Sequence, residues 1–320
     1  MSDVRHHRAE IGGTETGLRL DQALARLFTD YSRSALKAWI EAGLVTVNSG
    51  PCRPRDPVKT GDQIRLTAVL EASRNLTPEA VDFDVLHIDE ACIVVDKPAD
   101  LVVHPGAGNR NRTLANGLLY RFPELSQLPR AGLIHRLDKN TSGLLIVART
   151  SAAYQRLTRT MAARRIKRVY TAVANGRFIA GGTIDAPIGR DPANRTRMTV
   201  RGGGREAVTH YRVAAKFRTH THLEVHLETG RTHQIRVHLA HLGHPLVGDS
   251  RYGARVLLPP TPHPELERCL RGFARQALHA RRLEFPHPAG AGSIVVESPI
   301  PSDIFTLLGA CERDLAAAGA

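Results

Sequence analysis

One stretch of the chain determines how its fold is interpreted: Gly132-Leu133-Ile134-His135-Arg136-Leu137-Asp138-Lys139-Asn140-Thr141-Ser142-Gly143-Leu144-Leu145-Ile146-Val147. The apolar run from Leu144 to Ala148 has the length and content of a fully buried strand. The polar residues before it are therefore expected on the loop that leads into this strand. Asp138 on this loop is either a working carboxylate or the cap of an Asx-turn over the amides of residues 139–141. Local composition alone favours neither interpretation.

The composition limits the size of the fold and the kind of partner. The chain has 320 residues, enough for one large domain and one small domain. Its 44 lysines and arginines exceed its 31 acidic residues and give a net charge of +13. Such an excess indicates a polyanionic partner or an anionic surface, and by itself it does not distinguish RNA from DNA or membrane.

Targeting and redox features favour a cytoplasmic protein. No apolar run approaches the ~20 residues of a membrane span, and residues 1–17 lack the apolar segment of a signal peptide. The cysteines are widely separated and form no CxxC pair, which argues against a cysteine-bound zinc ion and against a disulfide framework. These cysteines are Cys52, Cys92, Cys269 and Cys311.

The N-terminal part is predicted to form a small α/β module over residues 18–67. A polar, mobile tail over residues 1–17 precedes it, and a linker over residues 68–84 follows it. A module of this length is near the lower limit for independent folding. Its expected elements are a helix from Leu18, a second helix between Ser32 as N-cap and Gly43 as C′ glycine, and strands at 44–48 and 63–66.

The large domain is predicted over residues 85–310, with a tail at 311–320. Strands and helices alternate there without regular βαβ order, which predicts an α+β fold with a mixed, mainly antiparallel central sheet. The clean alternation of residues 222–228 is typical of a half-buried strand. Further expected elements are strands at 85–88, 92–96, 144–148 and 169–173, and a helix capped by Ser151.

Two further segments carry candidate functional groups. In Lys167–Val173, Tyr170 is either a core aromatic residue or a ring that meets a substrate. In Glu228–Leu239, a strand end leads into a helix, and Arg236 lies next to the apolar face of that helix. A guanidinium there would be costly to bury without a partner. We expect Asp138 as the partner, because an arginine orients a carboxylate and keeps it ionised.

Four histidines suggest a competing chemistry, a metal-dependent hydrolase acting on RNA. His238 and His241 would share one helix face, as metal ligands do, and His233 and His244 lie nearby. A first-row metal site would need a carboxylate or cysteine nearby, and the chain has no HExxH motif. No metal site is therefore predicted.

The block His135-Arg136-Leu137-Asp138 resembles the catalytic motif of RNA pseudouridine synthases, in particular those of the RluA/RluD branch. The resemblance runs from about Leu18 to Pro301. Residues 101–109 and 275–280 look most like the RluD subgroup, whose members modify large-subunit ribosomal RNA. Asn140 departs from the family pattern, in which an acidic residue is common at this position.

The resemblance implies a reaction in which uracil is detached from C1′ of a uridine and reattached through C5. Asp138 would start the reaction, Arg236 would hold Asp138, and Tyr170 would stack on the flipped base and assist loss of the C5 proton. Arg136 would fill the space left by the flipped nucleotide or hold its phosphate. The other RNA-binding residues of these motifs are His135 and Arg231. Neither a cofactor nor a metal is implied.

The N-terminal module resembles the small RNA-binding domain named after a ribosomal protein of the small subunit. It carries, in order, Arg19-Leu20-Asp21, Ser32-Arg33-Ser34 and the run Gly43–Asn48. Basic residues on its polar faces would contact phosphates, which positions a protein without reading sequence. They are Arg19, Arg33, Lys37 and Arg53, with Arg26, Arg55 and Lys59. The implied partner is large-subunit rRNA or an assembling ribosomal subunit, with no membrane and no protein partner.

Two alternatives remain within RNA biology. One is a catalytically inactive RNA-binding or ribosome-assembly factor, and the other is a synthase that acts on a different rRNA or tRNA site. An inactive relative is expected to lack Asp138, Tyr170 or Arg236, and all three residues are present.

Overall fold

The computed structural model describes residues 3–28, 31, 33–70, 76–106, 108–194, 196–253 and 255–319. Contacts divide the chain into two compact units, Met1–Arg74 and Asn75–Ala320, and each has its own apolar core. No helix in the described ranges is long and apolar enough to cross a membrane. The N-cap predicted at Ser32 falls outside the described residues.

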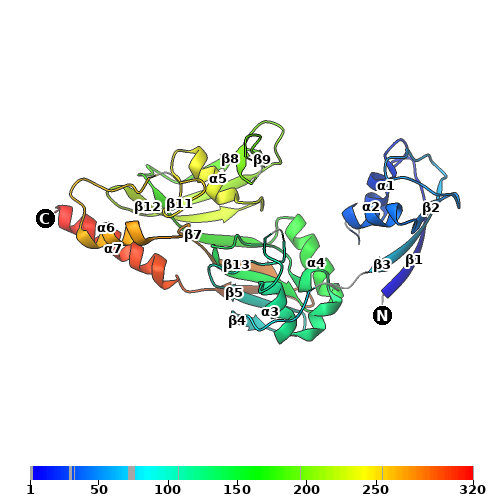
Figure 1. The fold of residues 1–320 in the computed structure, drawn as a ribbon, viewed down its shortest axis with the longest axis horizontal. Helices are drawn as coiled ribbons and strands as arrows, with labels where there is room; N and C mark the ends of the chain where they lie inside the picture. Colours follow the sequence, from blue (N-terminus) through cyan, green and yellow to red (C-terminus); the bar gives the residue numbers. More distant parts are fainter. Residues whose placement is uncertain are drawn as a thin grey trace. The chain divides into compact units, whose positions relative to one another are not determined.

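The small unit packs two helices against a three-stranded sheet of order β1-β3-β2 (Figure 1). Its elements are β1 (Asp3–Glu10), α1 (Leu20–Leu27), α2 (Arg33–Glu41), β2 (Val45–Val47) and β3 (Gln63–Leu70). The core is built by apolar residues at helical spacing, such as Leu20 and Leu24, against Ile64 of β3. Gly43 ends α2 as predicted: its φ is 72°, and its N–H donates to the carbonyl of Ile40 at 3.0 Å.

The prediction of a mobile tail over residues 1–17 was wrong. β1 pairs antiparallel with β3, from Asp3 opposite Leu70 to Glu10 opposite Gln63. Backbone hydrogen bonds hold this polar strand at the edge of the sheet, so its side-chain composition carries little strand signal.

The large unit is built on a nine-stranded sheet within the described residues, of order β4-β5-β6-β13-β7-β12-β11-β8, with β14 paired to β13. Its strands are β4 (Asp84–Ile88), β5 (Cys92–Lys97), β6 (Ser142–Ala148), β7 (Lys167–Asn175), β8 (Gly182–Asp185), β11 (Val208–Lys216), β12 (His220–Leu227), β13 (Leu278–Pro286) and β14 (Ser293–Glu297). A separate pair consists of β9 (Ile188–Arg190) and β10 (Met198–Val200). Only the β6–β13 pair is parallel, which confirms the mixed, mainly antiparallel sheet.

The helices of the large unit lie around this sheet (Figure 1). They are α3 (Leu114–Arg121), α4 (Ser151–Ala162), α5 (Gln234–His241), α6 (Pro264–Gly272) and α7 (Ser302–Gly319), with 3-10 turns η1 (Pro123–Gln127) and η2 (Pro129–Gly132). The cap of α4 is Thr150 rather than the predicted Ser151, because the Thr150 side chain accepts the N–H of Ala153.

The centre of the sheet places the candidate residues next to one another. Every residue of β6 is buried, as the apolar run predicts. The strand begins two residues before Leu144, at Ser142, because Gly143 (φ 113°) lets the backbone of β13 approach closely. A Cβ at Gly143 would lie 2.3 Å from the carbonyl oxygen of Ala280. The loop before β6 therefore lies beside β13, and β7 follows as the next strand.

The prediction of a tail at residues 311–320 was also wrong, because α7 continues to Gly319. Ile304, Leu307, Leu308 and Cys311 recur at helical spacing and are buried against α6 and neighbouring residues. Asp314 adds a buried ion pair to Arg218 at 3.2 Å. The C-terminal helix is therefore part of the core of the large unit.

Candidate active site

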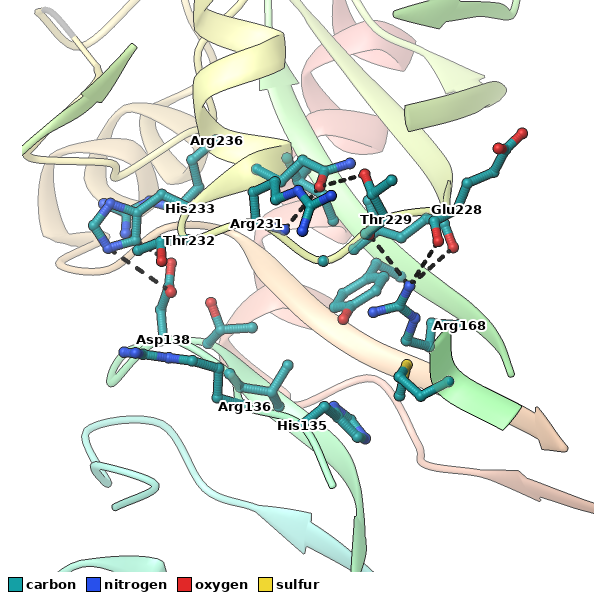
Figure 2. Close-up of a pocket in the computed structure, with 18 of the residues that line it drawn as sticks. His135, Arg136, Asp138, Arg168, Glu228, Thr229, Arg231, Thr232, His233 and Arg236 are labelled. Atoms are coloured by element: carbon teal, nitrogen blue, oxygen red, sulfur yellow. Dashed lines mark hydrogen bonds and ion pairs between the residues drawn. The ribbon is translucent and has the colours of Figure 1, made fainter. Parts of the chain in front are cut away.

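Asp138 lies on the loop between η2 and β6 and faces a cavity (Figure 2). The backbone closes this turn, since the Thr141 N–H donates to the Asp138 carbonyl at 3.1 Å. The carboxylate itself is 14% exposed and accepts from Nη1 of Arg236 at 2.9 Å. Among the described residues no backbone amide donates to it, so the Asx-turn interpretation has no supporting hydrogen bond.

Arg236, on α5, is shared between two carboxylates. Its Nε and Nη2 donate to Asp249 at 2.7 and 2.8 Å, and its Nη1 alone reaches Asp138. The contact expected between Arg236 and Asp138 is therefore present, but the bidentate contact of the guanidinium is with Asp249. Asp249 also accepts the backbone N–H groups of Arg251 and Tyr252. Burial alone would raise the pKa of Asp249, but the hydrogen bonds and charge of Arg236 outweigh burial and lower it.

The second carboxylate oxygen of Asp138, Oδ1, has no hydrogen bond among the described residues. Oδ1 lies 3.8 Å from Nε2 of His233, which is too long for a hydrogen bond. Burial lowers the pKa of His233, against the opposing charge of Asp138, so this ring is neutral at pH 7. Its Nδ1 lies 2.8 Å from the hydroxyl of Tyr252, which accepts the N–H of Met198. Arg236 thus contacts two acidic side chains, of which Asp138 is the more exposed, at 14% against 0% for Asp249.

Lys97, at the end of β5, stabilises the loop that carries Asp138. Its Nζ donates to the carbonyl oxygens of Pro98 at 2.7 Å and of Lys139 at 2.9 Å, the residue after Asp138. Burial lowers the pKa of Lys97 to about 7, and the charge of Asp138 opposes that shift. Lys97 thus fixes the backbone on which the carboxylate stands.

Tyr170, on β7, lines the same cavity as Asp138, and the cavity has a volume of about 480 Å³. Its ring is 5% exposed. Burial raises the pKa of Tyr170, Arg168 opposes that shift and Asp138 adds to it, so the phenol keeps its proton at neutral pH. Within the described residues its hydroxyl has no hydrogen-bond partner, which leaves this group free for a bound molecule.

The other residues predicted around Asp138 reach the cavity in different ways. Arg136 is exposed and lines both this cavity and a second one of about 620 Å³, which also contains Asp138. His135 holds the loop to β6, because its Nε2 accepts the N–H of Ile146 at 3.2 Å. Burial, with the charges of neighbouring arginines, lowers the pKa of His135 to about 3, so its ring is neutral. Arg231 lines the cavity and donates from Nε to the carbonyl of Glu206 at 2.8 Å.

Five of the seven basic residues predicted in the small unit line one hollow beside a buried acid, whereas Arg26 and Lys59 do not line it. Asp21, on α1, forms ion pairs with Arg19 at 3.1 Å and Arg33 at 2.7 Å. These three residues line one surface hollow with Lys37, Arg53 and Arg55. Cations outnumber acids in this hollow, which suits a phosphate backbone.

The histidines near α5 do not converge as metal ligands. His238 is buried, with Nδ1 at 2.8 Å from the Thr209 hydroxyl and Nε2 at 2.9 Å from the Ala186 carbonyl. His244 reaches the Asn175 carbonyl through Nδ1, and His241 is exposed. The described histidines of this segment therefore have separate partners.

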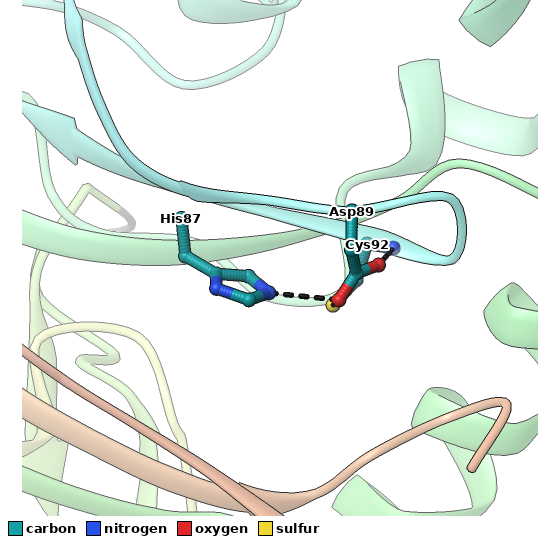
Figure 3. A group of neighbouring side chains, drawn as sticks. All are labelled: His87, Asp89 and Cys92. Atoms are coloured by element: carbon teal, nitrogen blue, oxygen red, sulfur yellow. Dashed lines mark hydrogen bonds and ion pairs between the residues drawn. The ribbon is translucent and has the colours of Figure 1, made fainter.

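One other group has metal-ligand chemistry, His87, Asp89 and Cys92 at the β4–β5 turn (Figure 3). Oδ1 of Asp89 accepts the N–H groups of Ala91 and Cys92, and Oδ2 faces His87 Nε2 at 2.8 Å and His287 Nε2 at 3.1 Å. These hydrogen bonds account for the cluster, because they tie the β4–β5 turn to the segment after β13.

Several residues that hold the site around Asp138 in place were not predicted from the sequence. Asp249 and Tyr252 follow Gly248 in a turn without periodicity, and neither stands out in the sequence. Lys97 directly follows the strand predicted at 92–96 and was not among the predicted site residues. Its place at the end of a mostly apolar strand was the local signal, since a lysine there requires an explanation.

Family models match both units of the chain. Residues 91–241 match the family model described as RNA pseudouridylate synthase, and residues 18–64 match the S4 domain. The curated protein "Ribosomal large subunit pseudouridine synthase D" of Pseudomonas aeruginosa is 48% identical, over 98% of each chain. The protein of the same name from Escherichia coli K12 is 47% identical, over 96% of this chain and 94% of its own.

Solved structures resemble part of this chain. Human RNA pseudouridylate synthase domain containing 1 gives a TM-score of 0.53 at 27% identity, over 70% of this chain and 86% of that chain. Human RNA pseudouridylate synthase domain containing 4 gives 0.56 at 23% identity, over 71% and 92%, and supports the fold alone.

Proposed function

This chain belongs to the RNA pseudouridylate synthase family, and we propose that it isomerises specific uridines of large-subunit ribosomal RNA to pseudouridine. In this isomerisation the N1–C1′ bond breaks, C5 bonds to C1′, and the C5 proton is lost while N1 gains one. No redox step and no external group transfer occur, so the reaction requires no cofactor. One observation carries the proposal: Asp138, held by Arg236, shares a cavity with the hydroxyl of Tyr170, which has no hydrogen-bond partner among the described residues.

Asp138 is the group proposed to start the reaction. Its Oδ2 is bound by Arg236, whereas Oδ1 has no hydrogen bond among the described residues. An ionised carboxylate with one free oxygen can add to C1′, add to C6 of the ring, or remove the C2′ proton. Each route needs the negative charge, and the Asp249–Arg236 pair keeps that charge oriented.

Tyr170 is proposed to receive the flipped base. A uracil taken out of an RNA stack loses its neighbours, and an aromatic ring replaces about 1–3 kcal/mol of that stacking. A cavity of about 480 Å³ is large enough for a pyrimidine nucleotide. The protonated phenol is also placed to assist transfer of the C5 proton.

The ribosomal substrate and the role of the small unit are proposals from the named relatives and from charge. The relatives act, by name, on the large ribosomal subunit. The hollow around Asp21 carries Arg19, Arg33, Lys37, Arg53 and Arg55, and we assign it to RNA phosphates. Because its substrate would be ribosomal RNA or an assembling subunit, we place the protein in the cytoplasm.

The test compares pseudouridines in the ribosomal RNA of cells with and without this gene, followed by restoration with purified protein. We expect specific large-subunit positions to lose pseudouridine in the deletion strain. Purified protein should restore the same positions in unmodified large-subunit RNA without added metal or cofactor. Unchanged ribosomal RNA together with lost tRNA pseudouridines would reassign the substrate, and no change in either RNA would reject the proposed activity.

A further inference from the structure

Arg168, on β7, is a buried cation without a carboxylate partner. It is 7% exposed, and its Nη2 donates to the carbonyl oxygens of Leu227, Glu228 and Thr229 at 3.3, 3.3 and 3.2 Å (Figure 2). No acidic side chain pairs with it in the described parts of the chain. Arg236, by contrast, lies between two carboxylates. A buried guanidinium without a counter-charge is costly, and a ligand that carries or develops negative charge would offset that cost.

Two donor nitrogens of Arg168 have no acceptor among the described residues. Nε is buried without an acceptor. Nη1 also has no acceptor among the described residues, and Arg168 lines the cavity that holds Asp138 and Tyr170. The three carbonyl oxygens bind Nη2 and so fix the orientation of the guanidinium. The direction of Nη1 is therefore fixed as well.

The absence of a side chain at Gly230 leaves space beside Nη1 of Arg168. A Cβ at position 230 would lie 2.8 Å from Nη1 of Arg168, and apart from the two chain neighbours of Gly230 no other described residue would lie within 4 Å of that Cβ. The backbone of Gly230 is outside the left-handed region, so its conformation alone does not require glycine. A side chain at position 230 would instead displace the Arg168 guanidinium, and Gly230 lines the same cavity.

The spacing relates Arg168 to the base. Arg168 and Tyr170 are two residues apart on one strand, so their side chains share a face about 7 Å apart. A pyrimidine stacked on Tyr170 would thus present an edge to Arg168. Uracil offers carbonyl oxygens at C2 and C4, whereas cytosine replaces the second with an amino group. An N–H donor fits the uracil edge and leaves cytosine with donor facing donor.

We propose that Arg168 binds the C4 carbonyl oxygen of the flipped uracil and stabilises the negative charge on the ring while its bond to C1′ is open. This inference rests on the proposed function of the same cavity. When the N1–C1′ bond breaks, its electron pair stays on the ring and spreads to both carbonyl oxygens. The pair then forms the C5–C1′ bond, C5 loses a proton and N1 gains one. Arg168 exchanges no proton, and a fixed cation beside the developing charge lowers the barrier.

The test uses Arg168→Met, which removes the charge while keeping an unbranched apolar side chain, in the full-length protein. Lys167→Met is the matched control, because Lys167 lies on the same strand, is exposed and pairs with Glu284 at 2.6 Å. Two quantities are measured: the single-turnover rate at saturating enzyme, and the affinities for a target stem-loop with uridine or cytidine at the modified position.

For wild type and Lys167→Met we expect tighter binding of the uridine RNA, by about tenfold to a hundredfold. In Arg168→Met this preference should disappear, affinity for the cytidine RNA should be unchanged, and the rate should fall by at least about a hundredfold. Arg168→Lys should recover part of the rate. A brace for the 227–229 carbonyls alone would lower the unfolding midpoint and leave the rate at saturation unchanged.

Two results would overturn the role of Arg168. One is an Arg168→Met rate within threefold of wild type. The other needs no variant and applies even if Arg168→Met does not fold: wild type that binds both RNAs equally. A wild type that forms no pseudouridine in any RNA would instead reject the proposed function, and its preference for uridine could still be measured.

Discussion

Replacing Arg236 tests the pair of carboxylates that it holds. Arg236→Ala removes three hydrogen bonds that the guanidinium donates to carboxylates, two to Asp249 and one to Asp138. The Asp249 side chain has no exposed surface, so it would remain buried and charged with only two backbone N–H donors. Breaking a buried pair in this way costs about 3–5 kcal/mol. In a domain of about 250 residues this corresponds to a midpoint roughly 6–20 °C lower.

The assay must report on the large unit. Trp39 is the single tryptophan and lies in the small unit, so its fluorescence would follow the wrong transition. Calorimetry or far-ultraviolet circular dichroism resolves the large unit. Arg313→Ala is the matched control, because Arg313 also forms a two-pronged pair, with Glu265, but is half exposed. Its loss should cost no more than about 1 kcal/mol.

A second substitution separates stability from activity. Adding Asp249→Asn to Arg236→Ala removes the orphaned charge, so the double variant should regain part of the lost stability. Activity should not return, because Asp138 still lacks its donor. The reasoning fails if Arg236→Ala costs no more than Arg313→Ala, or if the two substitutions at 236 and 249 simply add.

Three further outcomes are expected. Tyr170→Phe should keep RNA affinity and slow turnover, whereas Tyr170→Ala should also weaken binding by about 1–3 kcal/mol; equal rates for Tyr170→Phe and wild type would exclude the phenol from proton transfer. Deleting residues 1–74 should weaken RNA binding and reduce the log–log salt slope by about 0.7–0.9 for each phosphate that the shortened protein no longer binds, while saturating RNA should restore much of the single-turnover rate; an unchanged slope would mean that the small unit does not bind RNA. Burial lowers the pKa of His220 and His279 to about 4, so each is neutral in the fold and takes up a proton more readily when unfolded. Stability in urea should therefore be retained above about pH 6.5 and fall by up to about 3 kcal/mol per histidine towards pH 4, and stability that rises on acidification would contradict this.

The parts of the fold that could be predicted are those whose signal is local. The apolar run before Ala148 is a strand buried on both faces, and its composition alone indicates this. The end of α2 at Gly43 could be predicted because it depends on the backbone conformation of that one residue. The segments of Asp138, Tyr170 and Arg236 were found through motif resemblance. The parallel pairing of β6 with β13 is what brings these segments together, and no local pattern reveals it.

The features that were missed depend on distant partners. β1 is polar and is held by the backbone of β3, more than fifty residues away in the chain. Asp249 lies in an irregular turn, and its importance appears only when Arg236 is seen to face it with two nitrogens. Arg168 was part of a basic run, and its burial distinguishes it from the exposed Lys167 beside it. In each case long-range packing decides the role, and composition does not.

The central claim is that the charge of Asp138 starts uridine isomerisation, and Asp138→Asn tests it most directly. The substitution keeps the shape of the side chain and removes its negative charge. Purified Asp138→Asn protein should match wild type in unfolding midpoint and in affinity for large-subunit RNA, yet form no detectable pseudouridine in single turnover. Appreciable pseudouridine formation by this variant, free of wild-type enzyme, would contradict the account.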